Sequence, residues 1–293
     1  MRGRSMMSDF RRWLTQPRLG AYVAAFESSR TASVLALALL ATAVAVGGAA
    51  AEPGVGEDKI LFGQSAAFQG PAAALGLGAR EGILAAFLEA NASGGVHGRR
   101  LELIARDDGY EPTRAIENTK KLIHDDQVFA LLGEVGTPTS KAVQPIATAA
   151  GVPFIGPFTG VRFLRDPRLR NVINIRASYD QETEAWIRYL VDELGLTRGA
   201  ILYQDDSFGR AGLSGVGRAV DRRALALVGE GTYMRNTTAS KTAFLAIRRG
   251  DPLAVVMVGA YKPCAAFIRL ARRFDLDALF VNISFVGSKA LAK

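Results

Sequence analysis

The feature that most constrains the fold is a regular alternation of short apolar runs with amphipathic stretches of helical length, from residue 59 almost to the C-terminus. Strands that alternate with helices in this way predict βαβ units and parallel sheets covered on both faces. The near-continuous apolar runs 129–132 and 253–258 agree, because a strand buried on both faces needs no polar alternation. The sequence therefore predicts an α/β fold.

The expected elements divide into two halves. A charged, proline-containing segment at 161–170 breaks the pattern, and the strand after it is a plausible crossover between two lobes. We expect two Rossmann-like lobes with parallel sheets, at 52–173 and 178–293, joined by a hinge at 174–177. The expected strands are 59–64, 101–106, 128–132, 152–155, 172–175, 200–203, 227–232, 254–258 and 279–282. The expected helices are 78–91, 112–125, 138–150, 181–194, 209–225, 240–249 and 264–274.

The N-terminal 51 residues have the pattern of an export signal. Residues 31–51 carry no charge, Arg30 precedes them, and three small residues end the run at Ala51. A basic flank, an apolar stretch and a small-residue cleavage site predict a signal peptide cut after Ala51, preceded by an N-terminal extension. The alternative is a membrane anchor, because about 20 apolar residues can span a bilayer.

Charge and composition exclude several classes of function. The chain carries a net charge of +8, but residues 52–293 hold 30 Lys and Arg against 26 Asp and Glu, and they show no basic stripe interleaved with aromatic residues. We therefore expect no nucleic-acid partner. Two His and the single Cys264 argue against a zinc site, and the apolar pattern around Cys264 predicts a buried, inert thiol. No metal or cofactor is expected.

The candidate enzyme motifs do not match the full patterns of known catalytic or cofactor-binding motifs. Residues 212–216 lack the final glycine of a nucleophile elbow, and residues 215–220 lack the final glycine of a dinucleotide fingerprint. Asp205 and Asp206 could supply a base for an exported hydrolase, but no nucleophile or metal set accompanies them. We therefore expect a chain that is not an enzyme.

The loops that follow the strands are the places to look for a ligand, because parallel α/β sheets bind ligands at the carboxyl ends of their strands. In the loop after 128–132, Thr137 is expected to cap the next helix, with Pro138 at its first position. Free N–H groups of Thr139 and Ser140 would then face an anion. The alternative is that Thr137 merely caps its own helix.

Other strand-end loops add hydroxyl, aromatic and acidic side chains. Phe68 lies in a loop that could close over a ligand, and Thr159 lies in a rigid Gly-Pro loop. Aromatic and acidic residues from the second half would suit an amine or a planar ring. Capping of the following helix is an equal alternative for Asp206 and Ser207.

Taken together, these stretches resemble type I periplasmic solute-binding proteins of the leucine/isoleucine/valine-binding class, the receptors of ABC importers. The matching stretches occur in family order from residue 58 onward. They are 70–71, 91–99, 107–108 with Pro112, 128–133, 151–155, 204–209 and 259–261.

The resemblance implies a small-molecule ligand, hinge closure and a membrane permease as partner. It places the ligand's α-carboxylate at Thr137 and at 158–160, and its ammonium group at Asp180. The family's acid in the last loop is replaced here by Ser284, which also admits an aliphatic acid, an amide or an aromatic acid. The expected ligand contacts are Phe68, Thr137, Thr139, Phe158, Thr159, Gly160, Tyr179, Asp180, Phe208, Tyr261 and Ser284.

The resemblance also implies a C-terminal segment that this chain lacks, because such proteins cross back to the first lobe and complete its sheet. We expect the C-terminal part to be truncated, and the chain to be less stable than a full family member because an apolar sheet face or edge is left exposed. An alternative to a periplasmic receptor is a membrane-tethered sensor of the same fold, in which residues 31–51 remain uncleaved.

Overall fold

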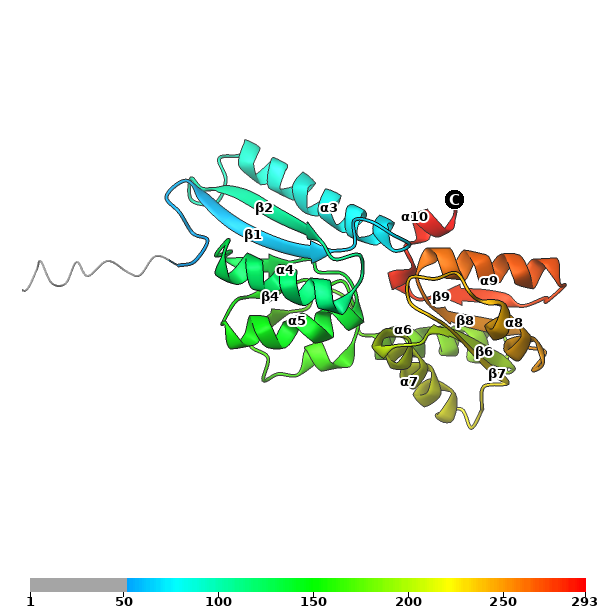
Figure 1. Cartoon of the computed structure of the whole chain (residues 1–293). Coiled ribbons are helices and arrows are strands. Elements are labelled where there is room, and N and C mark those ends of the chain that lie inside the picture. Colours follow the sequence, from blue (N-terminus) through cyan, green and yellow to red (C-terminus); the bar gives the residue numbers. More distant parts are fainter. Residues whose placement is uncertain (1–51) are drawn as a thin grey trace, which may run out of the picture. The chain divides into compact units, whose positions relative to one another are not determined.

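Two parallel sheets form the framework of the described part of the chain, residues 52–293 of a computed structural model (Figure 1). The expected signal peptide and its cleavage site after Ala51 lie outside the described residues. No helix in the described range is both long enough and apolar enough to cross a bilayer.

The first sheet has the strand order β2-β1-β3-β4-β5, with every neighbouring pair parallel. We call the part built on it lobe 1. Its elements are β1 (Lys59–Ala66), α3 (Ala73–Ala92), β2 (Arg100–Asp107), α4 (Pro112–His124), β3 (Ala130–Leu132), α5 (Thr137–Ala149), β4 (Phe154–Ile155), a 3₁₀ turn (Arg162–Arg165) and β5 (Val172–Ile173).

The second sheet has the order β7-β6-β8-β9, again fully parallel, and carries lobe 2. Its elements are α6 (Tyr179–Ile187) with a π-helical continuation (Arg188–Glu193), β6 (Gly199–Gln204), α7 (Ser207–Asp221), β7 (Gly229–Tyr233), α8 (Lys241–Arg248), β8 (Ala254–Val258), α9 (Tyr261–Arg273), β9 (Leu279–Asn282), a 3₁₀ turn (Ser284–Val286) and α10 (Ser288–Leu291). The lobe boundaries at 173 and 178 stay a prediction.

All the strands and helices expected from the sequence are present, and the α/β prediction with two parallel sheets is confirmed. The largest difference is the start of α3, which begins at Ala73 and not at residue 78. Gly76 hid this turn, because glycine is a poor helix former. A Cβ on Gly76 would lie 2.0 Å from the carbonyl oxygen of Ala67, so the glycine permits the close approach of helix and strand end.

Buried residues of both lobes form one core cluster, to which individual strands and helices contribute unequally. All five residues of β8 are buried, as the apolar run predicted. On α3, Leu88 is 73% exposed and Leu84 is 45% exposed, so the apolar residues of this helix are buried only in part. Ile175, after the edge strand β5, is 78% exposed.

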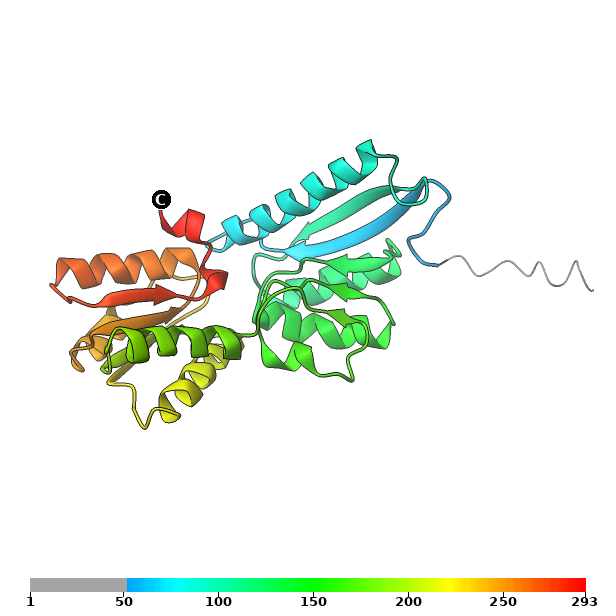
Figure 2. The ribbon, with the colours of Figure 1, turned by 180° about the vertical axis from the view of Figure 1, so that it is seen from behind.

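The exposed apolar residues of lobe 1 accompany an uneven covering of its sheet. Helices α4 and α5 lie in front of this sheet in Figure 1 and behind it in Figure 2, where no described helix lies in front of β3, β4 and β5. Exposed apolar surface beside an edge strand favours association. The expectation of reduced stability in the isolated chain stays a prediction.

Candidate functional site

Residues that follow the strands bring the two lobes into contact. The carboxyl ends of the strands in both sheets lead into loops that meet, as the strand-end rule for parallel sheets predicts. The tyrosine hydroxyl of Tyr261, at the start of α9, accepts a hydrogen bond from the backbone N–H of Ala74 at 3.3 Å. A hydroxyl from the other lobe thus accepts from one of the N–H groups that the first turn of α3 leaves without a partner inside the helix.

A cluster of aromatic side chains fills the centre of this contact. The ring of Phe285 lies 4.7 Å from that of Phe208, 5.4 Å from that of Phe158 and 6.0 Å from that of Tyr110, between centroids. Tyr179 adds a further ring 5.7 Å from Phe208. Tyr110 and Phe158 come from lobe 1 and the other three from lobe 2. These distances are typical of tilted aromatic pairs, so the cluster holds the two lobes together.

A chain of buried hydroxyls lies beside the aromatic cluster. The hydroxyl oxygens of Thr137 and Thr159 are 2.6 Å apart, and the Thr159 hydroxyl also donates to that of Tyr179 at 3.3 Å. All three side chains are at most 1% exposed. Gly160 completes the arrangement, because its carbonyl accepts from the N–H of Tyr179 and a Cβ at this position would lie 2.5 Å from the Tyr179 ring. The structure thus joins four of the expected site residues.

The N-terminus of α5 differs from the sequence expectation by one residue. Gly136 occupies the N-cap position, at φ +108°, and Thr137 is the first helical residue, so the prediction that Thr137 caps the helix is wrong. The Thr139 hydroxyl donates to the carbonyl of Val135 at 2.6 Å, and the N–H of Ser140 donates to the carbonyl of Gly136. Ser140 therefore offers no free N–H to an anion. No side chain caps this helix end.

A pocket of about 740 Å³ opens where lobe 1, α9 and the C-terminal turns meet. Three of the expected site residues, Phe158, Tyr261 and Ser284, line it. Leu75 and the neighbouring turns of α3 add apolar wall, and Lys289 supplies a positive charge. Glu81 supplies a negative one. A pocket of this size, mostly apolar and with a few charged groups, suits a small amphipathic molecule.

At Ser284, the structure supplies the carboxylate that the sequence lacks there. The Ser284 hydroxyl donates to Glu182 at 2.9 Å, its backbone N–H donates to the same carboxylate, and the Arg176 guanidinium bonds the hydroxyl. Arg176 also lies 4.6 Å above the ring of Phe158. Burial raises the pKa of Glu182, and the hydrogen bonds from Ser284 offset part of that rise. Glu182 is thus an acid beside the pocket residue Ser284.

Of the expected site residues only Phe158, Tyr261 and Ser284 line this pocket, and Asp180 and Phe68 also lie outside the aromatic cluster and the hydroxyl chain. Asp180 forms an ion pair with Arg218 of α7. Because successive helical residues are about 100° apart, Asp180 and Glu182 point to nearly opposite sides of α6. Phe68 stays on the α3 side of lobe 1, where the Arg80 guanidinium lies 4.6 Å above its ring. The ligand roles expected for Asp180 and Phe68 stay predictions.

Two buried carboxyl groups lie at the carboxyl ends of the lobe 1 strands. Asp108 is completely buried, accepts hydrogen bonds from the Ser65 hydroxyl at 2.9 Å and the Tyr110 N–H at 2.8 Å, and has a pKa that burial raises to about 6. Glu134 is 1% exposed, and its partner is the Thr119 hydroxyl at 3.4 Å. Burial, and then the nearby Asp108, raises the pKa of Glu134 well above its usual value.

These raised pKa values predict that the protein is more stable at pH 5 than at pH 8. A carboxyl with a raised folded-state pKa stays protonated while the unfolded chain ionises, so stability falls as pH rises above about 4. Asp108 accounts for about 3 kcal/mol of loss between pH 4 and 6, because each pKa unit is worth about 1.4 kcal/mol, and about 1.4 kcal/mol of it falls above pH 5. Glu134, whose pKa is also raised, adds to this loss.

Chemical denaturation between pH 5 and pH 8 measures this dependence. Glu134→Gln keeps the shape and removes the titration, so we expect it to flatten the slope. Glu117→Gln, at an exposed position on α4, is the control and should leave the slope unchanged. A wild-type stability that rises from pH 6 to pH 8 would contradict the prediction.

Several residues of the site carried no sequence signal that we recognised. Tyr110 follows the Asp107-Asp108 pair at the end of β2. Its φ of +63° lies in the left-handed region, which residues other than glycine rarely adopt. Phe285 lies next to Ser284, one position from the residue that drew attention. Both positions follow strands, so inspection of every aromatic residue at a strand end would have found them.

The described residues thus define a two-lobed α/β binding fold, with a pocket and a buried aromatic cluster where the lobes meet. A sequence model described as "Periplasmic binding protein" matches residues 59–293. The chain belongs to this family of periplasmic binding proteins. The resemblance to the leucine/isoleucine/valine-binding class is confirmed. The family consists of non-enzymatic solute-binding proteins, which confirms the prediction that the chain is not an enzyme.

Individual relatives support the same conclusion. A possible leucine/isoleucine/valine-binding protein from Rhodopirellula baltica SH 1 is 41% identical, with a TM-score of 0.77 over 80% of this chain and 64% of that one. The "Amino acid binding protein" of Pseudomonas aeruginosa is 25% identical over 236 residues, 80% of this chain and 62% of the relative. The branched-chain amino acid transporter substrate-binding protein LivJ of Streptococcus pneumoniae, in complex with isoleucine, shares the fold at 23% identity and a TM-score of 0.67, over 77% of this chain and 64% of that one. The chain spans about three-fifths of the length of the curated relatives it matches.

Proposed function

We propose that the chain is the substrate-binding component of an ABC importer, and that it binds an amino acid or a related small carboxylate between its lobes. The observation that carries this proposal is the 740 Å³ pocket where the two lobes meet, lined by Phe158, Tyr261 and Ser284. The ligand undergoes no chemistry. The lobes close around the ligand, and a membrane permease binds the closed form with a different affinity from the open form.

The chemistry of the pocket favours a ligand with an apolar body and a carboxylate. Leu75, Phe158 and Tyr261 provide apolar and aromatic contacts, and Lys289 provides a partner for a negative charge. Glu81 lines the pocket and is available to an ammonium group, whereas Asp180 is paired with Arg218. The names of the R. baltica and P. aeruginosa relatives, which refer to leucine, isoleucine and valine and to an amino acid respectively, support this class of ligand.

The family and the N-terminal pattern both support export to the periplasm. We propose that residues 1–51 direct export and that the mature chain begins at Glu52. N-terminal sequencing of the exported protein tests this point, because a chain that retains residues 31–51 is the membrane-tethered sensor instead. The truncated C-terminal end likewise stays a prediction.

Native mass spectrometry of the exported protein, followed by denaturation, tests the ligand proposal. We expect release of an amino acid or another small carboxylate, and a thermal shift with members of the same class. Lys289→Gln is expected to weaken binding of that ligand about tenfold or more, since a hydrogen bond to a charged group contributes about 1.5–3 kcal/mol. Lys120→Gln, at an exposed position on α4, should have no effect. An empty spectrum with no shift across amino acids and organic acids would overturn the proposal.

A further inference from the structure

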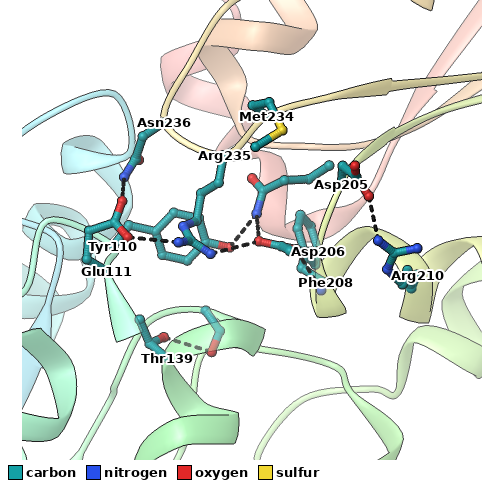
Figure 3. Close-up of polar contacts among 12 residues, drawn as sticks. Tyr110, Glu111, Thr139, Asp205, Asp206, Phe208, Arg210, Met234, Arg235 and Asn236 are labelled. Carbon is teal, nitrogen blue, oxygen red and sulfur yellow. Dashed lines mark hydrogen bonds and ion pairs between the residues drawn. The ribbon is translucent and has the colours of Figure 1, made fainter. Parts of the chain in front are cut away.

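The ion pair between Arg235 and Glu111 differs from all others among residues 52–293. An Arg235 nitrogen lies 2.8 Å from one carboxylate oxygen of Glu111. The other Glu111 oxygen accepts from the side-chain amide of Asn236 at 2.7 Å, as Figure 3 shows. Within the described range this ion pair alone joins the two lobes, because every other pair lies within one lobe. We call Glu111, Arg235 and Asn236 the latch.

Local sequence explains why these side chains reach across. Glu111 occupies the N-cap position of α4, and Pro112 after it restricts Glu111 to an extended backbone, observed at φ −113° and ψ 122°. The Glu111 side chain makes no capping hydrogen bond to its own helix. On the other lobe, Asn236 has φ +59° in the loop between β7 and α8, and its amide also donates to the carbonyl of Gly109 at 3.0 Å.

The latch is connected to the centre of the contact between the lobes. Arg235 also pairs with Asp206 at 3.2 Å, and Asp206 caps α7 by accepting from the N–H of Phe208. Gln204 donates to Asp206 at 2.6 Å and to the hydroxyl of Tyr110 at 3.4 Å. The Arg235 side chain is 24% exposed and that of Asp206 is 15% exposed, so solvent screens this network less than a fully exposed pair.

We propose that the latch sets the fraction of molecules in which the lobes are closed before any ligand arrives. Contacts between Glu111 and both Arg235 and Asn236 exist only while the two lobes touch, so they lower the free energy of the closed form alone. The effect of the latch on the closed fraction is independent of the ligand. The consequence for affinity rests on the proposed function: the apparent dissociation constant rises in proportion as the closed fraction falls.

The test measures closure without ligand, in the full exported protein. Spin labels at Lys120→Cys on α4 and Lys241→Cys on α8 report the distance between the lobes, because both positions are exposed and Cys264 is completely buried. Glu111→Gln and Arg235→Gln are each expected to lower the ratio of closed to open molecules about tenfold. Because the two residues act through one contact, the double variant should differ little from either single variant.

The control is Arg114→Gln, which removes a pair of similar length with Asp107 inside lobe 1 and should leave the distance unchanged. High salt should open the wild-type protein and have little effect on the variants. Distance distributions that are the same in wild type and both latch variants would overturn the proposal. A lower closed fraction in the variants would support the latch even if isoleucine bound neither the wild type nor the variants. The lack of binding would then count against the proposed function only for isoleucine. Opening without a weaker isoleucine affinity, where isoleucine binds, would overturn the link to affinity.

Discussion

Replacing Gly209 with alanine is expected to lower the free energy of unfolding by about 3 kcal/mol or more. A Cβ on Gly209 would lie 1.8 Å from the carbonyl oxygen of Gln204, and also within 3 Å of two other backbone atoms of that residue. Backbone cannot rotate away as a side chain can, so either the start of α7 or the end of β6 must shift. The shift would also displace Phe208 and Asp206, which precede Gly209 at the contact between the lobes.

A glycine on the same helix provides the control. A Cβ on Gly217 meets no atom within 4 Å, and its backbone is helical. Gly217→Ala should therefore stabilise the protein by about 0.5–1 kcal/mol, the usual advantage of alanine over glycine within a helix. Urea denaturation followed by the fluorescence of Trp186, in α6, measures both changes in lobe 2. A Gly209→Ala variant as stable as the wild type would show that the helix and the strand end are not in close contact.

Replacing Phe285 with alanine is expected to have the largest effect on the contact between the lobes. Phe285 is completely buried and stacks on Phe208, Phe158 and Tyr110. Removal of a buried phenylalanine costs about 3–5 kcal/mol. Part of this loss falls on the contact with lobe 1, because two of the three ring partners belong to lobe 1. The closed fraction should therefore fall along with the overall stability.

Phe267→Ala separates loss of lobe contact from loss of lobe 2 stability. Phe267 is equally buried, but its ring partners Phe244 and Phe280 both belong to lobe 2. Both variants should lower the melting temperature, and only Phe285→Ala should lengthen the distance between spin labels at positions 120 and 241 below the melting transition. Equal distances in the two variants would contradict the role assigned to Phe285.

Much of the fold could be predicted from local sequence. Strands such as β8 and helices such as α9 were recognised because a buried strand has a continuous apolar run and a surface helix has an apolar face with a 3.6-residue period. Errors occurred where close packing required an atypical residue. Gly76 concealed the first turn of α3, and Gly136 takes the cap position expected for Thr137.

The candidate site could be predicted in part. The rule that ligands bind at the carboxyl ends of parallel strands led to Thr137, Thr159, Phe208 and Tyr261, and the structure places all four where the lobes meet. The same rule did not show which face of α6 meets the pocket. Asp180 and Glu182 are only two residues apart, yet one pairs with Arg218 and the other with Ser284.

The class of fold, the order of strands and helices, and the loops that meet between the lobes could be predicted without a structure, because they depend on hydrophobic periodicity and on parallel-strand geometry. The Phe285 cluster and the pairing of Glu111 with Arg235, which are 124 residues apart in the chain, became visible only in the folded protein. Such contacts depend on how two independently patterned lobes dock. No local pattern encodes that docking, because the residues on each side fulfil their own helix and loop preferences equally well without it.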